Sequence, residues 1–177
     1  MTVLHGSRCT VRPWRLSDAE ALVRHADNLN VARQLRDRFP HPYTRRHAAA
    51  FLKHASSPGE QTNLAIDVGG EAVGGIGFVP GSDVERFSCE IGYWLSEDYW
   101  GRGIAGEALS LLTGHLFEHL NMLRVFALPF ADNTGSIRVL EKAGYVREAT
   151  LRASSVKFGQ PKDQALFAIV NSEWRLP

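Results

Sequence analysis

A glycine-rich segment in the middle of the chain has the composition of a phosphate-binding turn. Residues 99–109 read YWGRGIAGEAL, so Gly101, Gly103 and Gly106 match the G-x-G-x-x-G spacing of dinucleotide-binding turns. That fingerprint should follow directly on a buried strand, whereas here the polar stretch SEDYW comes before the glycines. No Gly-Lys-Ser/Thr sequence closes the turn, so it does not match a P-loop either.

The same segment still fits a more general anion site. Helical spacing begins at Ile104, which places the glycines at a helix start, where the first backbone N–H groups lack an intrahelical partner. These donors and the helix dipole favour a phosphate or pyrophosphate, and glycine allows the backbone to approach it closely. Arg102 would add a positive charge. The alternative is a helix start whose glycines serve only close packing.

Apolar periodicity predicts the elements that must position this turn. Alternating or continuous apolar runs predict strands over residues 8–14, 62–68, 72–79, 87–95, 123–128, 145–152 and 164–170. Helical spacing predicts helices over residues 18–28, 31–37, 45–56, 104–120 and 133–143. Ser17, with Glu20, and Thr44 are expected as helix caps. The order predicts one α+β domain over residues 1–177 with a mixed sheet.

Composition and charge exclude several kinds of partner. The chain has 177 residues, is 44% apolar and 22% charged, and carries a net charge of +1, which favours neither nucleic acid nor a membrane. Cys9 and Cys89 have no metal-like or redox-like spacing, so both are expected to be buried thiols in a reducing compartment. The chain starts without an apolar signal core, and no apolar run is long enough to cross a bilayer. A cytoplasmic protein is expected.

Two segments together resemble the central motifs of the GNAT superfamily of N-acetyltransferases. They are WGRGIAGEAL (100–109) and NTGSIRVLEKAGY (133–145). The family pattern Gln/Arg-x-x-Gly-x-Gly/Ala is occupied here by residues 100–105, with Trp100 departing from it in the first position. That tryptophan, the stretch EIGYWL (90–95) and the opening VRPWRLSDAEAL (11–22) are similar to the ribosomal-protein-alanine (RimJ/RimL-like) branch. The likeness covers about residues 8–170.

The resemblance implies a fold and a cosubstrate. The sheet would be mostly antiparallel, with a central splayed pair formed by the strands holding residues 93–95 and 124–126. The cosubstrate would be acetyl-CoA, with no metal. Its pyrophosphate would be held by the turn residues Trp100, Gly101, Arg102, Gly103, Ile104, Ala105 and Gly106. The pantetheine arm would pair like an extra strand with Tyr93, Trp94 and Leu95, and the backbone N–H of Leu95 or Trp94 would stabilise the oxyanion.

The resemblance also implies direct attack of a primary amine on the thioester, without an acyl-enzyme. Glu90 would be the general base, directly or through a water, although a strand glutamate of this kind can simply form an ion pair. Ser136 would protonate the thiolate, and Asn133 would lie near the pantetheine. Tyr145 and a water are the other candidate acids, with core packing favoured for Tyr145. N-x-x-S is also a helix-capping pattern, and both roles can coexist.

The implied acceptor cleft lies between the first two helical segments and the connection of the last two strands. Its expected lining residues are Leu35, Arg36, Phe39, Pro40, His41, Tyr43, Ser154, Lys157 and Phe158. Few acids line it, which disfavours polycations and favours a peptide or protein N-terminal α-amine or a small-molecule amine. Relatives that acetylate ribosomal proteins can carry an acid where this chain has Ser154 and Ser155. The alternative function is a CoA-binding regulatory or interaction module without turnover, and a homodimer stays open.

Overall fold

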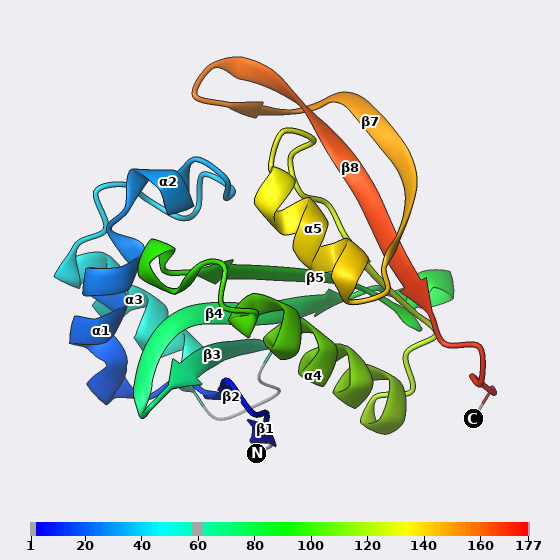
Figure 1. Cartoon of the computed structure of the whole chain (residues 1–177), viewed down its shortest axis with the longest axis horizontal. Helices are drawn as coiled ribbons and strands as arrows, with labels where there is room; N and C mark the ends of the chain where they lie inside the picture. The colour runs from blue at the N-terminus through cyan, green and yellow to red at the C-terminus, as the bar shows by residue number, and fades with distance from the viewer. Residues whose placement is uncertain (1–2, 58–61, 177) are drawn as a thin grey trace.

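The structure is a computed structural model that describes residues 3–57 and 62–176. Its centre is an eight-stranded sheet in the order β1-β2-β3-β4-β5-β6-β8-β7 (Figure 1). The strands are β1 (Leu4–His5), β2 (Thr10–Pro13), β3 (Asn63–Val68), β4 (Glu71–Pro80), β5 (Ser88–Leu95), β6 (Arg124–Ala127), β7 (Val146–Lys157) and β8 (Gln160–Val170). The helices are α1 (Ala19–Ala26), α2 (Leu29–Ala32), α3 (Arg45–Ala55), α4 (Ile104–His119) and α5 (Thr134–Lys142).

The sheet is mixed and mostly antiparallel, which confirms the predicted fold class. β3, β4 and β5 form the expected antiparallel meander. β5 and β6 are parallel, and their register runs from Ser88 opposite Arg124 to Glu90 opposite Phe126. Beyond Glu90, β5 continues to Leu95 with β4 on one side, and the structure records no β6 partner for these residues. The two central strands therefore part directly after Glu90, as expected for a splayed pair.

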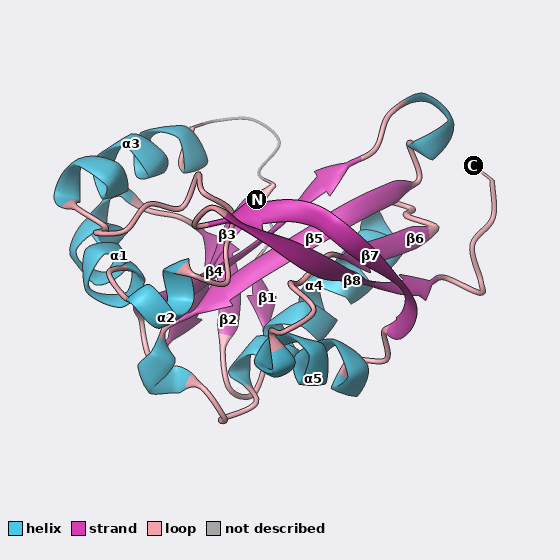
Figure 2. Ribbon diagram, turned by 90° about the horizontal axis from the view of Figure 1, so that it is seen from above, coloured by secondary structure: helices cyan, strands magenta, loops and turns pink. Residues whose placement is uncertain are grey.

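Helices cover both faces of the sheet and build a core on each (Figure 2). On one face α4 packs with Leu109, Leu112 and Leu116 against apolar strand residues such as Ile66 and Ile91. On the other face Leu22 of α1 and Leu52 of α3 pack around Trp14 and Ala65. Leu64 and Ile66 belong to the first core and Ala65 to the second, because successive strand side chains point to opposite faces. Cys9 and Cys89 are buried free thiols, as predicted.

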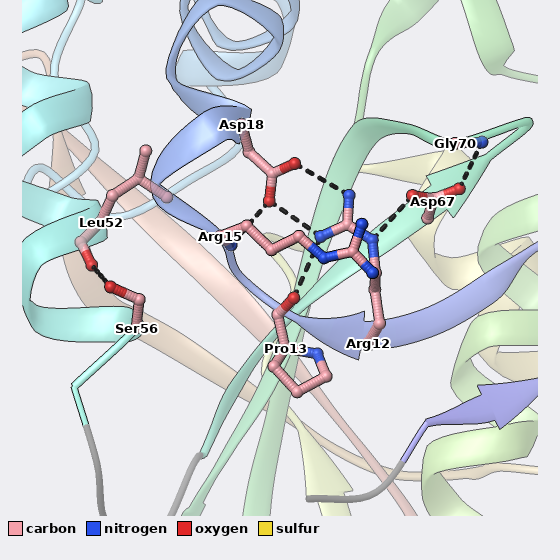
Figure 3. A network of polar contacts seen from close by, with 8 residues as sticks. All are labelled: Arg12, Pro13, Arg15, Asp18, Leu52, Ser56, Asp67 and Gly70. Atoms are coloured by element: carbon pink, nitrogen blue, oxygen red, sulfur yellow. Dashed lines mark hydrogen bonds and ion pairs between the residues drawn. The ribbon is translucent and has the colours of Figure 1, made fainter.

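A buried charge network fixes α1 against the sheet (Figure 3). Arg12 of β2 donates to Asp67 of β3 at 2.7 Å and makes two bonds of 2.8 Å with the Asp18 carboxylate. Asp18 also accepts the backbone N–H of Arg15, at 2.8 Å. The prediction that Ser17 caps this helix is therefore wrong. Residues 16–18 form a 3₁₀ turn, and the Asp18 carboxylate orders this turn while it also binds Arg12.

The segment after α1 differs from its prediction. The helix expected over 31–37 is instead the short α2 (Leu29–Ala32), which Asn28 caps by accepting the N–H groups of Asn30 and Val31. The following loop takes its conformation from distant partners, because Arg36 pairs with Glu90 and Asp37 pairs with Lys157. Helical propensity in residues 33–37 yields to these tertiary contacts. The cap at Thr44 is present, accepting the N–H of His47.

The last two strands are longer than predicted. Residues 153–163 were expected to include a loop, but β7 and β8 continue through them as a long hairpin above the sheet (Figure 1). Phe158 and Gly159 form its two-residue turn, with φ of 50° and 73°, as tight hairpin turns require. The extension has little core to cover, so its side chains lack the apolar alternation that reveals a strand. Among the described helices none is long and apolar enough to span a bilayer.

Candidate active site

The glycine turn leads into α4 with its backbone open to the outside. Gly103 is the N-cap of α4 and has φ of 76°, and Gly101 has φ of 75°, a region that L side chains rarely adopt. As a glycine, Gly103 offers no side chain to accept the first N–H groups of the helix. A Cβ placed on Gly101 or Gly106 would meet nothing within 4 Å. The turn therefore offers free donors and free space, which fits a phosphate group.

A second positive charge reaches this turn from the N-terminal segment. Glu107, in the first turn of α4, accepts the backbone N–H groups of Ser7, Arg8 and Cys9 and the Ser7 hydroxyl, at 2.7–3.0 Å. Burial alone would raise the pKa of Glu107, but these hydrogen bonds outweigh it and lower the pKa to about 2. They hold Arg8 beside the turn, where its Nε lies 3.3 Å from the position of a Cβ on Gly103. Sequence reasoning missed Arg8 and Glu107, because about a hundred residues separate them and no local pattern links them.

The free edge of β5 can be assigned from its backbone hydrogen bonds. The carbonyl of Ser88 accepts from Gly81, and the N–H of Ser96 donates to Val73, so even-numbered residues direct their backbone groups toward β4. Because these groups alternate along a strand, the backbone of Leu95 points toward the gap beside β6 and that of Trp94 does not. Of the two predicted N–H donors, the geometry therefore selects Leu95.

Trp100 and Ile104 have side chains with structural contacts. The indole N–H of Trp100 donates to the Leu95 carbonyl at 2.8 Å, which ties the start of the glycine turn to the end of β5. The Ile104 side chain is buried in the core under α4. Arg102 is exposed and lies over the Tyr99 ring at 5.1 Å. Ile104 thus anchors the turn to the core, Trp100 ties it to β5 from the surface, and Arg102 stays available to a ligand.

The candidate acid and base lie on opposite faces of the sheet. Tyr93 belongs to the face covered by α4 and α5, and its hydroxyl lies 2.8 Å from Ser136 Oγ of α5. Burial raises the pKa of Tyr93 to about 12, with the Ser136 hydrogen bond acting in the opposite direction, so the phenol keeps its proton. Glu90, three residues earlier on β5, points to the other face. A reacting atom in the gap between β5 and β6 is accessible from both faces.

Asn133 and Tyr145 have clear structural roles. Asn133 caps α5 by accepting the N–H of Ser136 at 3.1 Å, so the capping alternative is present and it also fixes the position of Ser136. Tyr145 is buried and pairs with Thr113 at 2.7 Å, and burial raises its pKa. Its hydroxyl is engaged in the core beneath α4. Of the two candidate acids, Ser136 is thus the one whose hydroxyl lies outside the core beneath α4, with Tyr93 beside it.

The face of β5 that carries Glu90 also carries Gly92 and Trp94. The Glu90 carboxylate forms an ion pair with Arg36 of the loop after α2. Gly92, the next residue on this face, is exposed, and a Cβ there would meet nothing within 4 Å. Trp94 follows on the same face and packs edge-on against Phe39 at 5.4 Å. Free space thus lies directly beside the candidate base.

Two cavities adjoin one another through Asp37 and Lys157, and their linings include Phe39, which contacts Trp94, and Arg36, which pairs with Glu90. One, of about 320 Å³, is lined by Leu29, Ala32, Asp37, Phe39, Pro40, His41, Lys157 and Phe158. The other, of about 240 Å³, is lined by Arg36, Asp37, Phe130, Ser154, Ser155, Val156, Lys157 and Gln164. The first lies within the range of about 300–1,000 Å³ typical of small-ligand sites. Of the expected lining, Leu35 and Tyr43 line neither cavity, and Tyr43 is buried under Phe39.

Comparison with known proteins identifies the family. The model of the acetyltransferase (GNAT) domain matches residues 8–146, which is most of the chain. The chain belongs to the GNAT acetyltransferase family. It is also 29% identical over 177 residues to the uncharacterized N-acetyltransferase p20 of Bacillus licheniformis, covering 98% of this chain and 99% of the relative. It is therefore an acyltransferase that transfers acetyl groups to amines, as the sequence motifs predicted.

Solved structures agree with the GNAT fold. A GNAT-family acetyltransferase from Bacillus anthracis superposes with a TM-score of 0.83 at 21% identity, over 96% of this chain and 98% of that one. RimL, a ribosomal L7/L12 α-N-protein acetyltransferase in complex with coenzyme A, superposes with a TM-score of 0.82 at 18% identity, over 96% and 98%. At these identities the likeness shows the shared fold. In this GNAT enzyme, the glycine turn and the parted strands are thus set in the architecture typical of the family.

Proposed function

We propose that the protein uses acetyl-CoA to acetylate the α-amine of a peptide or protein, or a primary amine of a small molecule. The observation that carries the proposal is the parting of β5 and β6 after Glu90, with a carboxylate on one side of the gap and a hydroxyl pair on the other. The named activity of RimL on ribosomal L7/L12, and its complex with coenzyme A, support both the donor and the peptide acceptor.

The donor side rests on residues that fit an anionic, amide-rich ligand. The free backbone groups from Gly101 to Gly106, with Arg102 and Arg8 beside them, would hold the pyrophosphate. The open edge of β5, from Tyr93 to Leu95, would pair with the pantetheine arm. Acetyl-CoA supplies an acetyl thioester that a deprotonated amine attacks directly. The Leu95 N–H, which faces the gap, would stabilise the negative oxygen that develops.

The acceptor side rests on Glu90. An amine must lose its ammonium proton before it attacks, and Glu90 would take that proton directly or through a water. Ser136, hydrogen-bonded to Tyr93, would return a proton to the thiolate that leaves. Because the two groups act from opposite faces, neither needs to move for the other to work.

Thiol release from acetyl-CoA, measured against amines and N-terminal peptides, tests this function. Glu90→Gln should lower kcat by about 100-fold, with a smaller loss at high pH where free amine is present, and Ser136→Ala should lower kcat at every pH. Coenzyme A should bind both variants as it binds the wild type. Tight coenzyme A binding without acetylation of any acceptor, and without an effect of either substitution, would favour a binding module instead.

A further inference from the structure

The acceptor cleft contains two ion pairs that adjoin one another. Arg36 pairs with Glu90, and Lys157 pairs with Asp37 at 2.8 Å. Arg36, Asp37 and Lys157 line the second cavity together, and Asp37 and Lys157 also line the first. Two cations and one carboxylate therefore line the adjoining cavities, and the second carboxylate, Glu90, is joined to them through its ion pair with Arg36.

Lys157 is buried while its partner is not. The Lys157 side chain is 4% exposed, and that of Asp37 is 76% exposed. An ammonium has three N–H donors, and in the described chain Asp37 Oδ1 is the one hydrogen-bond acceptor recorded for Lys157 Nζ, beside the Phe158 ring at 4.7 Å. A buried charge is costly unless its donors are satisfied. Lys157 therefore has donors left for a ligand, and its present acceptor is an exposed loop carboxylate that a ligand anion can displace.

Arg36 also favours a ligand that carries an anionic group. An ammonium that approaches Glu90 competes with the Arg36 guanidinium for the same carboxylate. The Arg36 side chain is 57% exposed, so the released guanidinium can bind either water or an anionic group of the ligand, and the bond to an anion is the stronger of the two. A neutral or purely cationic amine cannot supply that anion. A molecule that carries both an amine and an acid replaces both partners of the ion pair and keeps the charges balanced.

We propose, on the basis of the N-acetyltransferase function above, that the acceptor is a primary amine with a carboxylate or phosphate a few bonds away. Its ammonium pairs with Glu90 before losing its proton, and its anionic group binds Arg36 and Lys157 in place of Asp37. Phe39 and Phe158 pack against the apolar part of the molecule. Lys157 is thus a specificity-determining residue that selects acidic acceptors over their neutral analogues.

Matched acceptor pairs test this preference. The pairs are free serine with serine amide, O-phosphoethanolamine with ethanolamine, and C-terminally amidated peptides beginning Ser-Asp with those beginning Ser-Asn. Thiol release gives kcat/KM for the wild type and for Lys157→Met, Asp37→Asn and the control Lys162→Met. Lys162 is on the same hairpin, pairs with Asp132 and lines neither cavity.

The wild type should favour the acidic member of at least one pair by about tenfold or more, because tenfold is the lower end of what a hydrogen bond to a charged group contributes. Lys157→Met should remove that preference, because kcat/KM for the acidic member should fall by about tenfold more than kcat/KM for the neutral member. Asp37→Asn should increase the preference, because the competing carboxylate is gone, and Lys162→Met should keep it. The pair that responds tells whether the acid belongs to a small molecule or to an acidic peptide N-terminus.

Three results would overturn the inference. Equal kcat/KM within every pair would mean that no anion is recognised, while the acetyltransferase function itself would stand. Equal losses of kcat/KM for acidic and neutral acceptors in both Lys157→Met and Asp37→Asn would show that the Lys157–Asp37 ion pair only holds the hairpin in place. Acetylation of no acceptor, with coenzyme A still bound, would overturn the proposed function and this inference with it.

Discussion

Substitution of Glu107 by glutamine should destabilise the protein through the turn that we assign to acetyl-CoA. The Glu107 carboxylate accepts four N–H and O–H hydrogen bonds and one from the Cys9 thiol, all from residues Ser7–Cys9, and its side chain is 16% exposed. A glutamine would place an NH₂ group against backbone N–H donors that now meet an oxygen. At least one of these donors would lose its acceptor, and the loss is most costly for the N–H of Cys9, because Cys9 is buried whereas Ser7 and Arg8 are exposed.

The pKa of Glu107 gives the size of the effect. Hydrogen bonding, working against the desolvation that would raise it, lowers this pKa from 4.5 to about 2. At about 1.4 kcal/mol per pKa unit, the charged group stabilises the folded state by about 3 kcal/mol at neutral pH. For a chain of this length that corresponds to a fall in Tm of about 6–12 °C.

The pH dependence follows from the direction of the shift. Because the folded pKa is the lower one, the stabilisation is complete above pH 4.5 and is lost as the pH falls toward 2. The difference in the free energy of unfolding between the wild type and Glu107→Gln should therefore shrink by about 1.4 kcal/mol for each pH unit below 4.5.

Thermal and urea unfolding between pH 7 and 3.5 measure this difference. Glu118→Gln is the matched control, because Glu118 is an exposed residue of the same helix, and its free energy of unfolding should change by less than about 0.5 kcal/mol. A Tm within 2 °C of the wild type for Glu107→Gln at pH 7 would refute the reasoning, as would a difference that stays constant down to pH 3.5.

Three further substitutions separate donor binding, acceptor binding and proton transfer. Gly103 has φ of 76°, and Arg8 lies close to where a Cβ on Gly103 would be placed. Gly103→Val should therefore weaken coenzyme A binding by more than about tenfold in calorimetry, with an unchanged circular dichroism spectrum. Unchanged affinity would show that the turn is not part of the donor site. Gly92→Leu should fill the space beside Glu90 and lower kcat/KM for the acceptor by more than about tenfold at unchanged coenzyme A affinity. Full activity would mean that the acceptor binds elsewhere. Tyr93→Phe should lower kcat about tenfold without changing the KM of the donor, whereas an unaltered kcat would assign the Tyr93–Ser136 contact to packing alone.

Local patterns in the sequence were sufficient for most of the fold. The meander, the helix after the glycine turn and the caps at Thr44 and Asn133 each depend on residues a few positions apart, and all are present. The errors fall where distant contacts decide. The helix ends at Ala32, turn-type hydrogen bonds continue as far as Leu35, and Arg36 and Asp37 are then held by ion pairs with β5 and the hairpin. The 153–163 segment is a strand pair with no core pattern to reveal it.

For the candidate site too, the sequence predicted what local patterns determine and missed what distant contacts determine. The motif located the glycine turn, Glu90 and Ser136, because each lies within a short recognisable stretch. It could not reveal that Tyr93 bonds Ser136, that Glu107 holds Arg8 beside the turn, or that Lys157 meets Asp37 across 120 residues. These contacts arise only when strands from both halves of the chain join one sheet.

The parallel pairing of β5 and β6 brings the proposed donor and acid sites to one place. A helix follows each of these strands, so α4 begins after the end of β5 and α5 begins after the end of β6. Because the strands run in the same direction, both helix N-termini lie at the same edge of the sheet, and it is at this end that the strands part. The N–H groups at Gly103 and the hydroxyl of Ser136 therefore flank one gap. Antiparallel strands would have placed the two helix starts at opposite ends of the sheet, and no single thioester could then reach both.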